Sequence, residues 1–100
     1  MRFHSGEMMK RADILATAAE YVTKDRAATH GSAEDNFRRL ADLWAAYLNV
    51  GAITATDVAV MLALLKVARI RENPGHEDNW VDLAGYAACG GEIATGDEHG

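Results

Sequence analysis

The segment from Thr54 to Glu72 constrains the fold more than any other part of the chain. Eight consecutive residues within it, from Val58 to Leu65, are apolar. Lys66, Arg69 and Arg71 then follow within two helical turns. A helix that is apolar on every side belongs inside a protein or inside an assembly. We therefore expect this helix to be central, and the bases near its end need either a partner or a function.

The composition indicates a single globular domain. The chain has 100 residues, of which 49% are hydrophobic and 25% are charged, so it can bury one core and differs from a disordered chain. We expect one helical domain over residues 1–100, with a core of about 7–94 and a frayed tail over 95–100. The net charge of −5 argues against a nucleic acid polymer as partner, whereas a small anion needs only a local basic cluster.

The sequence lacks the signals of a secreted or membrane protein. Cys89 is the only cysteine, which excludes an internal disulfide framework, and the four histidines lack the spacing of a zinc site. The longest apolar run is shorter than the ~20 residues that cross a bilayer. The first residues also lack the apolar core of a signal peptide. We therefore expect a soluble cytoplasmic protein with no membrane partner.

Apolar residues recur at helical spacing along the chain, which predicts an all-α fold. We expect a compact four-helix domain with the apolar third helix at its centre. Thr54 and Asp57 resemble a capping box at the start of this helix, and Asn73-Pro74-Gly75 ends it. The other expected helices are a first one after a cap at Ser5, a second over about 33–49 that stops near Gly51 and packs antiparallel to the third, and a fourth over about 78–94.

A loop of about ten residues, KDRAATHGS, separates the first two expected helices. Loops of this length in small domains often carry function. Arg26 and His30 are its chemically capable residues, and Gly31 precedes Ser32, which is suited to cap the next helix.

Asp82 is the most informative polar residue, because its neighbours in WVDLAGYAAC are apolar or small. A buried carboxylate needs a partner or it becomes neutral. Lys66 has the same problem on the third helix, so we expect Asp82 to meet Lys66 or Arg69 across a helix contact. Two interpretations are open. The pair either fixes the register of two helices, or Asp82 orients a base beside a ligand cavity.

In the functional interpretation, Lys66, Arg69 and Arg26 surround a cavity together with Arg38 or Arg39. Guanidinium groups suit bidentate recognition of phosphate. The aromatic residues that could stack on a nucleobase are Tyr86, one turn beyond Asp82, and Trp44, Trp80 or the imidazole of His30.

The acidic residues give little support for a metal site. All-α nucleotide pyrophosphohydrolases hold Mg²⁺ with Glu-x-x-Glu and Glu-x-x-Asp pairs, and this chain has neither. Glu77, Asp78 and Asp82 form at most a partial cluster. We expect no cofactor, with Mg²⁺ on these three residues as the alternative.

Three segments together carry a family resemblance: DRAATHGSAEDNFRRLADLWAAYL, TDVAVMLALLKVARIREN and HEDNWVDLAGYAACGGEI. They resemble a small helical domain of unknown function that is common in phages and prophages. Its members read approximately D-R-x-x-x-Y-G, then N-F, L-W, D-V-A, L-K-x-A-R and D-x-x-V-D-x-A-G-Y-A. The resemblance covers about residues 12–94. His30 stands where the pattern usually has tyrosine, which puts any role of a phenol there in doubt.

That family is in turn distantly similar to nucleotide-modification-associated domains and to all-α pyrophosphohydrolase-like (MazG-like) domains. The resemblance therefore implies a nucleotide ligand, while the missing carboxylate pairs argue against hydrolysis. Carried onto this chain, the family pattern selects Arg26, His30, Gly31, Asn36, Asp57, Lys66, Arg69, Asp82 and Tyr86.

We expect a phage protein, acting in the cytoplasm of the bacterial host, that binds a phosphorylated nucleotide-derived ligand without catalysis. By analogy of size, it would sequester a host immune signal such as a cyclic dinucleotide or an ADP-ribose derivative. The expected contacts are Arg26, Lys66 and Arg69 to phosphate, His30 and Tyr86 to base or ribose, and Asp82 to a cation or a ribose hydroxyl.

We also expect a homo-oligomer, because a 100-residue monomer would struggle to cover the apolar helix. The alternatives are a magnesium-dependent pyrophosphohydrolase and a structural or protein-binding module whose charges only pair with one another.

Overall fold

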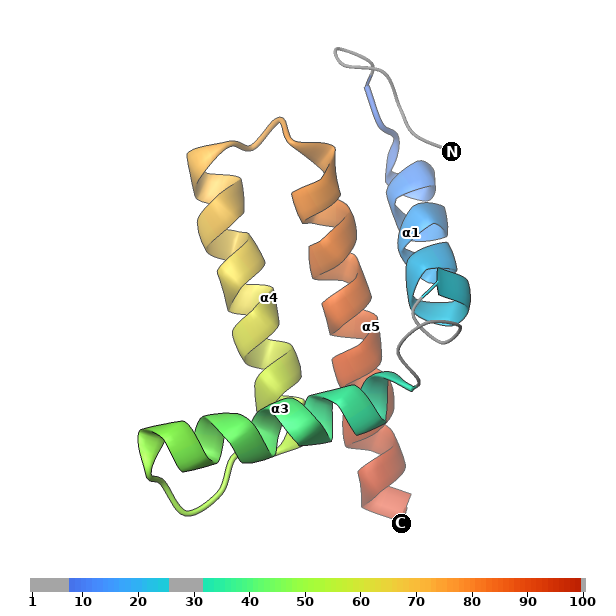
Figure 1. The fold of residues 1–100 in the computed structure, drawn as a ribbon. Coiled ribbons are helices and arrows are strands. Elements are labelled where there is room, and N and C mark those ends of the chain that lie inside the picture. Colours follow the sequence, from blue (N-terminus) through green and yellow to red (C-terminus); the bar gives the residue numbers. More distant parts are fainter. Residues whose placement is uncertain (1–7, 26–31, 100) are drawn as a thin grey trace.

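Helix α5 (Glu77–His99) organises the fold, because every other helix packs against it. The computed structural model describes residues 8–25 and 32–99. Within these ranges the chain forms four α-helices and no strand, which confirms the all-α prediction (Figure 1). The other elements are α1 (Arg11–Glu20), which continues into the π-helix η1 (Tyr21–Asp25), then α3 (Ala33–Leu48) and α4 (Ala55–Glu72).

The two ends of the domain differ from the expected boundaries. Helix α1 begins only at Arg11, where the carboxylate of Asp13 accepts a 3.2 Å hydrogen bond from the backbone N–H of Lys10. The proposed cap at Ser5 lies outside the described residues. At the other end, α5 is helical to His99 and so includes most of the tail that was expected to fray.

Side-chain caps start α3 and α4 as the sequence predicts. The Ser32 hydroxyl accepts a hydrogen bond from the Asp35 N–H at 3.1 Å. At α4 the capping box is complete. The Thr54 hydroxyl accepts from the Asp57 N–H, and the Asp57 carboxylate accepts from the Thr54 N–H, both at 3.0 Å. These bonds satisfy N–H groups that have no partner inside the helix.

Replacing Thr54 with alanine should lower the free energy of unfolding by about 1 kcal/mol, because it removes the acceptor for the Asp57 N–H. For a domain of this size the melting temperature should fall by roughly 4–8 °C. Thermal melts followed by circular dichroism would measure the change, with Thr17→Ala in α1 as the control. Unchanged stability of the Thr54 variant would contradict the assigned cap.

Helix α3 does not run antiparallel beside α4, and that prediction is wrong. Instead α3 crosses the α4–α5 hairpin near one end (Figure 1). The helix ends at about the expected residue, but Asn49, rather than the expected Gly51, stops it, in a left-handed conformation with φ of 57°. Asparagine tolerates this conformation better than most residues, and it turns the connection away from the helix axis.

The core lies where α3, α4 and α5 meet. Its fully or largely buried residues are Phe37, Ala41, Ala55, Val58, Ala59, Cys89 and Ile93. The buried residues of α3 lie in its first nine positions, Trp44 packs against the core while only partly buried, and Leu48 near the end of the helix is 53% exposed. Small residues predominate on the α4 side of this core, which allows the helices to approach closely.

Helix α4 packs against both α3 and α5, yet one of its faces is open. Its buried residues are Ala55, Val58 and Ala59, all near its start. Leu64, further along the apolar run, is 60% exposed. Among the described helices, none is long and apolar enough to span a membrane.

The turn between α4 and α5 forms as predicted, since α4 ends at Glu72 just before Asn73-Pro74-Gly75. The indole N–H of Trp80 donates a 2.9 Å hydrogen bond to the Pro74 carbonyl. This bond ties the first turns of α5 to the connection and gives Trp80 a structural partner.

Candidate functional site

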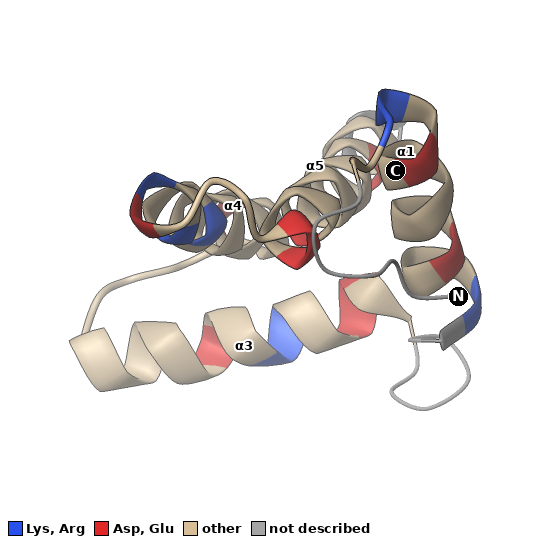
Figure 2. Cartoon of the chain, turned by 90° about the horizontal axis from the view of Figure 1, so that it is seen from above, with Lys and Arg blue, Asp and Glu red and all other residues tan. Residues whose placement is uncertain are grey.

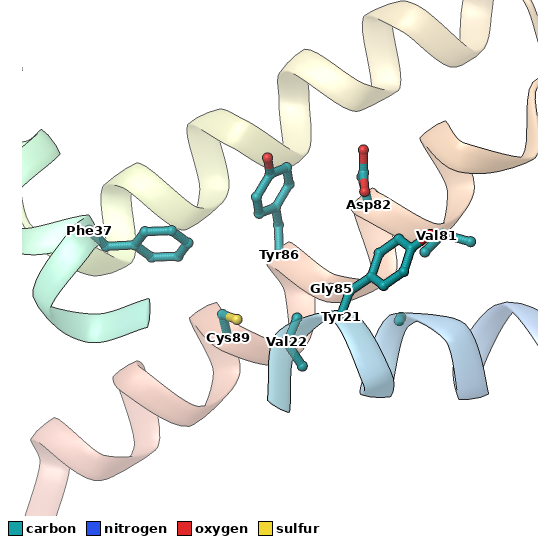
Figure 3. A pocket seen from close by; sticks show the side chains of 9 residues that line it. Tyr21, Val22, Phe37, Val81, Asp82, Gly85, Tyr86 and Cys89 are labelled. Carbon is teal, nitrogen blue, oxygen red and sulfur yellow. The ribbon is translucent and has the colours of Figure 1, made fainter. Parts of the chain in front are cut away.

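Asp82 and Tyr86 lie one turn apart on α5 and point toward α4 (Figure 3). From α4, the ammonium group of Lys66 approaches the Asp82 carboxylate, with 2.8 Å between Nζ and Oδ2. The two side chains are only 14% and 30% exposed. The structure therefore confirms the predicted contact and identifies Lys66, rather than Arg69, as the partner of Asp82.

The ion pair between Lys66 and Asp82 has a structural role, because it connects two helices. It joins the middle of α4 to the first turns of α5, where water screens it less than it would a surface pair. Arg69 lies three residues beyond Lys66 and is exposed, and the ion pairs found within the described chain do not include it.

A small cavity lies between the α1–η1 segment, α5 and the Phe37 ring of α3 (Figure 3). Tyr21 and Val22 line one side, and Asp82, Tyr86 and other residues of α5 line the opposite side. Its volume of about 20 Å³ suits a single water molecule and excludes a nucleotide. The ligand site predicted around Asp82 and Tyr86 is therefore not this cavity.

A larger groove runs between α3 and the α4–α5 hairpin, with a volume of about 350 Å³. This volume falls in the range of small-molecule sites. The groove is lined by Asn36, Phe37, Arg39, Leu40 and Leu43 from α3, by Leu62 from α4 and by Tyr86 from α5.

The polar residues of the groove are held in place by their neighbours. Nη1 of Arg39 donates a 3.0 Å hydrogen bond to the side-chain oxygen of Asn36, one turn earlier on α3. The rings of Tyr86 and Phe37 lie tilted at 53°, with 6.4 Å between their centroids. A guanidinium, an amide and a phenol thus share one largely apolar groove.

The ion pair sits next to this groove. Lys66 follows Leu62 by one turn on α4, and Asp82 precedes Tyr86 by one turn on α5, so each pair lies on one helix face. The fold brings the predicted residues Asn36 and Tyr86 into one groove and places Lys66 and Asp82 beside it. Arg26, His30 and Gly31 lie outside the described residues.

Few sequence signals point to the other residues of the groove. The sequence left open whether Arg38 or Arg39 lies beside a ligand cavity, and the structure distinguishes the two. Arg38 pairs with Glu34 at 3.1 Å, whereas Arg39 lines the groove. The only sequence signal for Arg39 is that it follows Asn36 by three residues, which places the two side chains on the same face of the helix. Leu40 and Leu62 also pack against the core, and Leu43 is a single exposed apolar residue, so no sequence pattern marks them as groove walls.

The alternative magnesium cluster is not formed. Over residues 8–25 and 32–99, no three acidic, histidine or cysteine side chains gather closely enough to hold a metal ion. Glu77, Asp78 and Asp82 therefore do not make a joint site, and Asp82 already binds Lys66. The carboxylates of Glu77 and Asp78 lie in the first turn of α5, where the helix dipole favours negative charge.

Comparison with known proteins places most of the helical region in one family. Residues 13–94 match the family described as "Domain of unknown function (DUF6378)". "Gene 55 protein" of Mycobacterium phage L5 is 50% identical over 74 residues, which are 74% of this chain and 47% of that protein. "Gene 55 protein" of Mycobacterium phage D29 is 36% identical over 76 residues, which are 76% of this chain and 50% of that protein.

The chain thus spans about half the length of the curated relatives it matches. No solved structure shows a significant match.

Proposed function

The chain belongs to the DUF6378 family, with curated relatives in mycobacteriophages, and on that premise we propose that it binds a phosphorylated, nucleotide-derived small molecule. The proposed site is the groove between α3 and the α4–α5 hairpin. The observation that supports it most is the presence of Arg39, Asn36 and Tyr86 together in a groove of about 350 Å³.

Each polar group in the groove suits one part of such a ligand. The Arg39 guanidinium offers paired N–H donors to a phosphate, and its bond to Asn36 limits the ordering cost of binding. The Tyr86 ring, backed by Phe37, offers a surface for a base or a ribose. A ligand seated against the apolar walls would displace water from the groove, which would strengthen these polar contacts.

The basic residues of α4 take separate roles in this proposal. Arg69 is exposed and can contact a second phosphate. Lys66 would have to leave Asp82 to do the same, so we assign it to holding α4 against α5. Arg26 and His30 remain proposed ligand contacts on the family pattern alone.

We further propose that binding is not followed by catalysis, so that the protein sequesters its ligand. A cyclic dinucleotide or an ADP-ribose derivative used as a host immune signal would fit the phage origin of the relatives. The resemblance to nucleotide-modification-associated and MazG-like domains supports the ligand class. The dispersed carboxylates of the described chain favour binding over magnesium-dependent hydrolysis.

Calorimetric titration with mononucleotides, cyclic dinucleotides and ADP-ribose derivatives would test the proposal. For a ligand that binds, Arg39→Gln should raise the dissociation constant by about 10–100-fold, as expected when a charge-assisted hydrogen bond to phosphate is lost. Arg38→Gln is the matched control, because Arg38 is on the same turn but does not line the groove.

If the Arg39 variant bound the ligand as tightly as the wild type, the groove would not be the ligand site. Chromatography of the ligand after incubation with the protein and Mg²⁺ should recover it unchanged. Recovery of a cleaved product would replace sequestration with hydrolysis.

A further inference from the structure

The open face of α4 carries a seam with a regular spacing. Asp57, Val60, Leu64, Val67 and Arg71 follow one another at intervals of three, four, three and four residues, so they form one stripe along the helix. The three apolar members are 53%, 60% and 49% exposed. The seam is therefore acidic at its start, apolar in its middle and basic at its end.

A shallow trough runs alongside this seam. It has a volume of about 280 Å³, and all the residues that line it belong to α4 and α5. Its α5 wall consists of Tyr86 followed by Ala87, Gly90 and Gly91, and the small size of the last three leaves room for larger side chains from outside. A ridge of large apolar residues and a trough of small ones thus lie next to each other on one surface.

We propose that this surface binds a second copy of the same chain, with the two α4 helices antiparallel about a twofold axis near Leu64. A twofold interface must be complementary to itself. The seam meets this condition, because each ridge would enter the trough of the other copy.

The charges on the seam favour the same arrangement. In an antiparallel pair centred on Leu64, Asp57 lies opposite Arg71 of the partner subunit, since the two positions are seven residues to either side of the axis. Figure 2 shows basic residues gathered at one end of α4. A parallel pair would instead place like charges opposite each other at both ends.

The length of the seam sets the expected strength. Helix α4 has 18 residues and is therefore roughly 27 Å long. Two helices of this length, with the adjacent α5 walls, bury an area at the low end for specific dimers. We expect a dissociation constant of about 1–100 µM.

Sedimentation equilibrium of the full chain without ligand, from about 1 µM to 1 mM, would measure the association. The mass should rise from the monomer value of 10.8 kDa toward twice that value. Leu64→Glu should stay monomeric throughout, because two carboxylates would meet at the axis. Leu15→Glu on α1 is the matched control, since Leu15 is 64% exposed and should leave the dimer intact. Circular dichroism would confirm that both variants keep their helices.

Charge reversals would test the orientation. Asp57→Lys alone and Arg71→Glu alone each create two repulsive pairs per dimer, so each should dimerise about tenfold more weakly or worse. Asp57→Lys also removes the acceptor for the Thr54 N–H, so circular dichroism must show that this variant keeps its helices. An equimolar mixture of the two variants restores both attractive pairs in the heterodimer and should associate more tightly than either variant alone. Failure of the mixture to recover association would overturn the antiparallel arrangement.

A wild-type protein that is monomeric at every concentration would overturn the proposal. The surface would then belong to another protein, or to a further part of a longer chain such as those of the relatives. Dimerisation that survives Leu64→Glu would place the interface elsewhere. None of these readouts depends on a nucleotide, so they stand or fall separately from the proposed ligand groove.

Discussion

Alanine at Gly90 should lower the free energy of unfolding by about 1–3 kcal/mol, whereas alanine at the adjacent Gly91 should raise it by up to about 1 kcal/mol. A Cβ at Gly90 would lie 2.8 Å from the Cβ of Ala59 on α4, and a Cβ at Gly91 would have nothing within 4 Å. The Ala59 methyl group is fixed to its backbone, so one of the two helices must move. The gain in helix propensity offsets only part of that cost.

Urea denaturation of both variants at low micromolar protein would measure the difference. Removing the opposing methyl group tests its cause, because Ala59→Gly combined with Gly90→Ala should recover part of the loss seen in Gly90→Ala alone. If the Gly90 and Gly91 variants were equally stable, the close contact between α4 and α5 at Ala59 would be refuted.

Replacing Asp82 with asparagine should cost about 2 kcal/mol, because it leaves the Lys66 ammonium without its carboxylate at a site where it is only 14% exposed. The melting temperature should fall by roughly 8–16 °C. The double variant Lys66→Met with Asp82→Leu should recover most of this loss, since apolar residues of similar size often replace a buried pair without penalty.

Differential scanning calorimetry of the single and double variants would give these stabilities, and titration of the double variant with any ligand found would separate structure from function. Retained binding supports the assignment of Lys66 to the helix contact. If a stable double variant no longer bound the ligand, Lys66 and Asp82 would instead be assigned as ligand contacts. A single variant as stable as the wild type would show that the ion pair contributes little.

The features that the sequence predicted well depend on neighbouring residues or on simple charge rules. The capping box at Thr54 involves residues three positions apart, and the stop at Pro74 follows from proline chemistry. The pairing of Asp82 with a base of α4 followed from the cost of burying each charge alone.

The orientation of α3 could not be predicted in the same way. It depends on the left-handed conformation of Asn49, which few residues adopt and which no periodic pattern signals. Leu48 near the end of α3 is 53% exposed for the same reason, because a helix that crosses its neighbours contacts them over only part of its length.

The groove was predicted only in part, because three helices build it. Asn36 was selected by the family pattern alone, and Tyr86 by that pattern and by its position one turn beyond Asp82, but neither signal shows that the two residues share a groove. Leu43 and Leu62 were missed, since an apolar residue on a groove wall and one in the core have the same sequence signature.

The central place of α5 has a consequence for the order in which the domain can assemble. Ribosomes release α1, α3 and α4 before α5, yet α5 is the helix against which each of them packs. During synthesis α3 and α4 can already pack against each other, whereas α1 and the side of α4 that faces α5 stay uncovered until α5 emerges. The folding of this domain is completed from its C-terminal side.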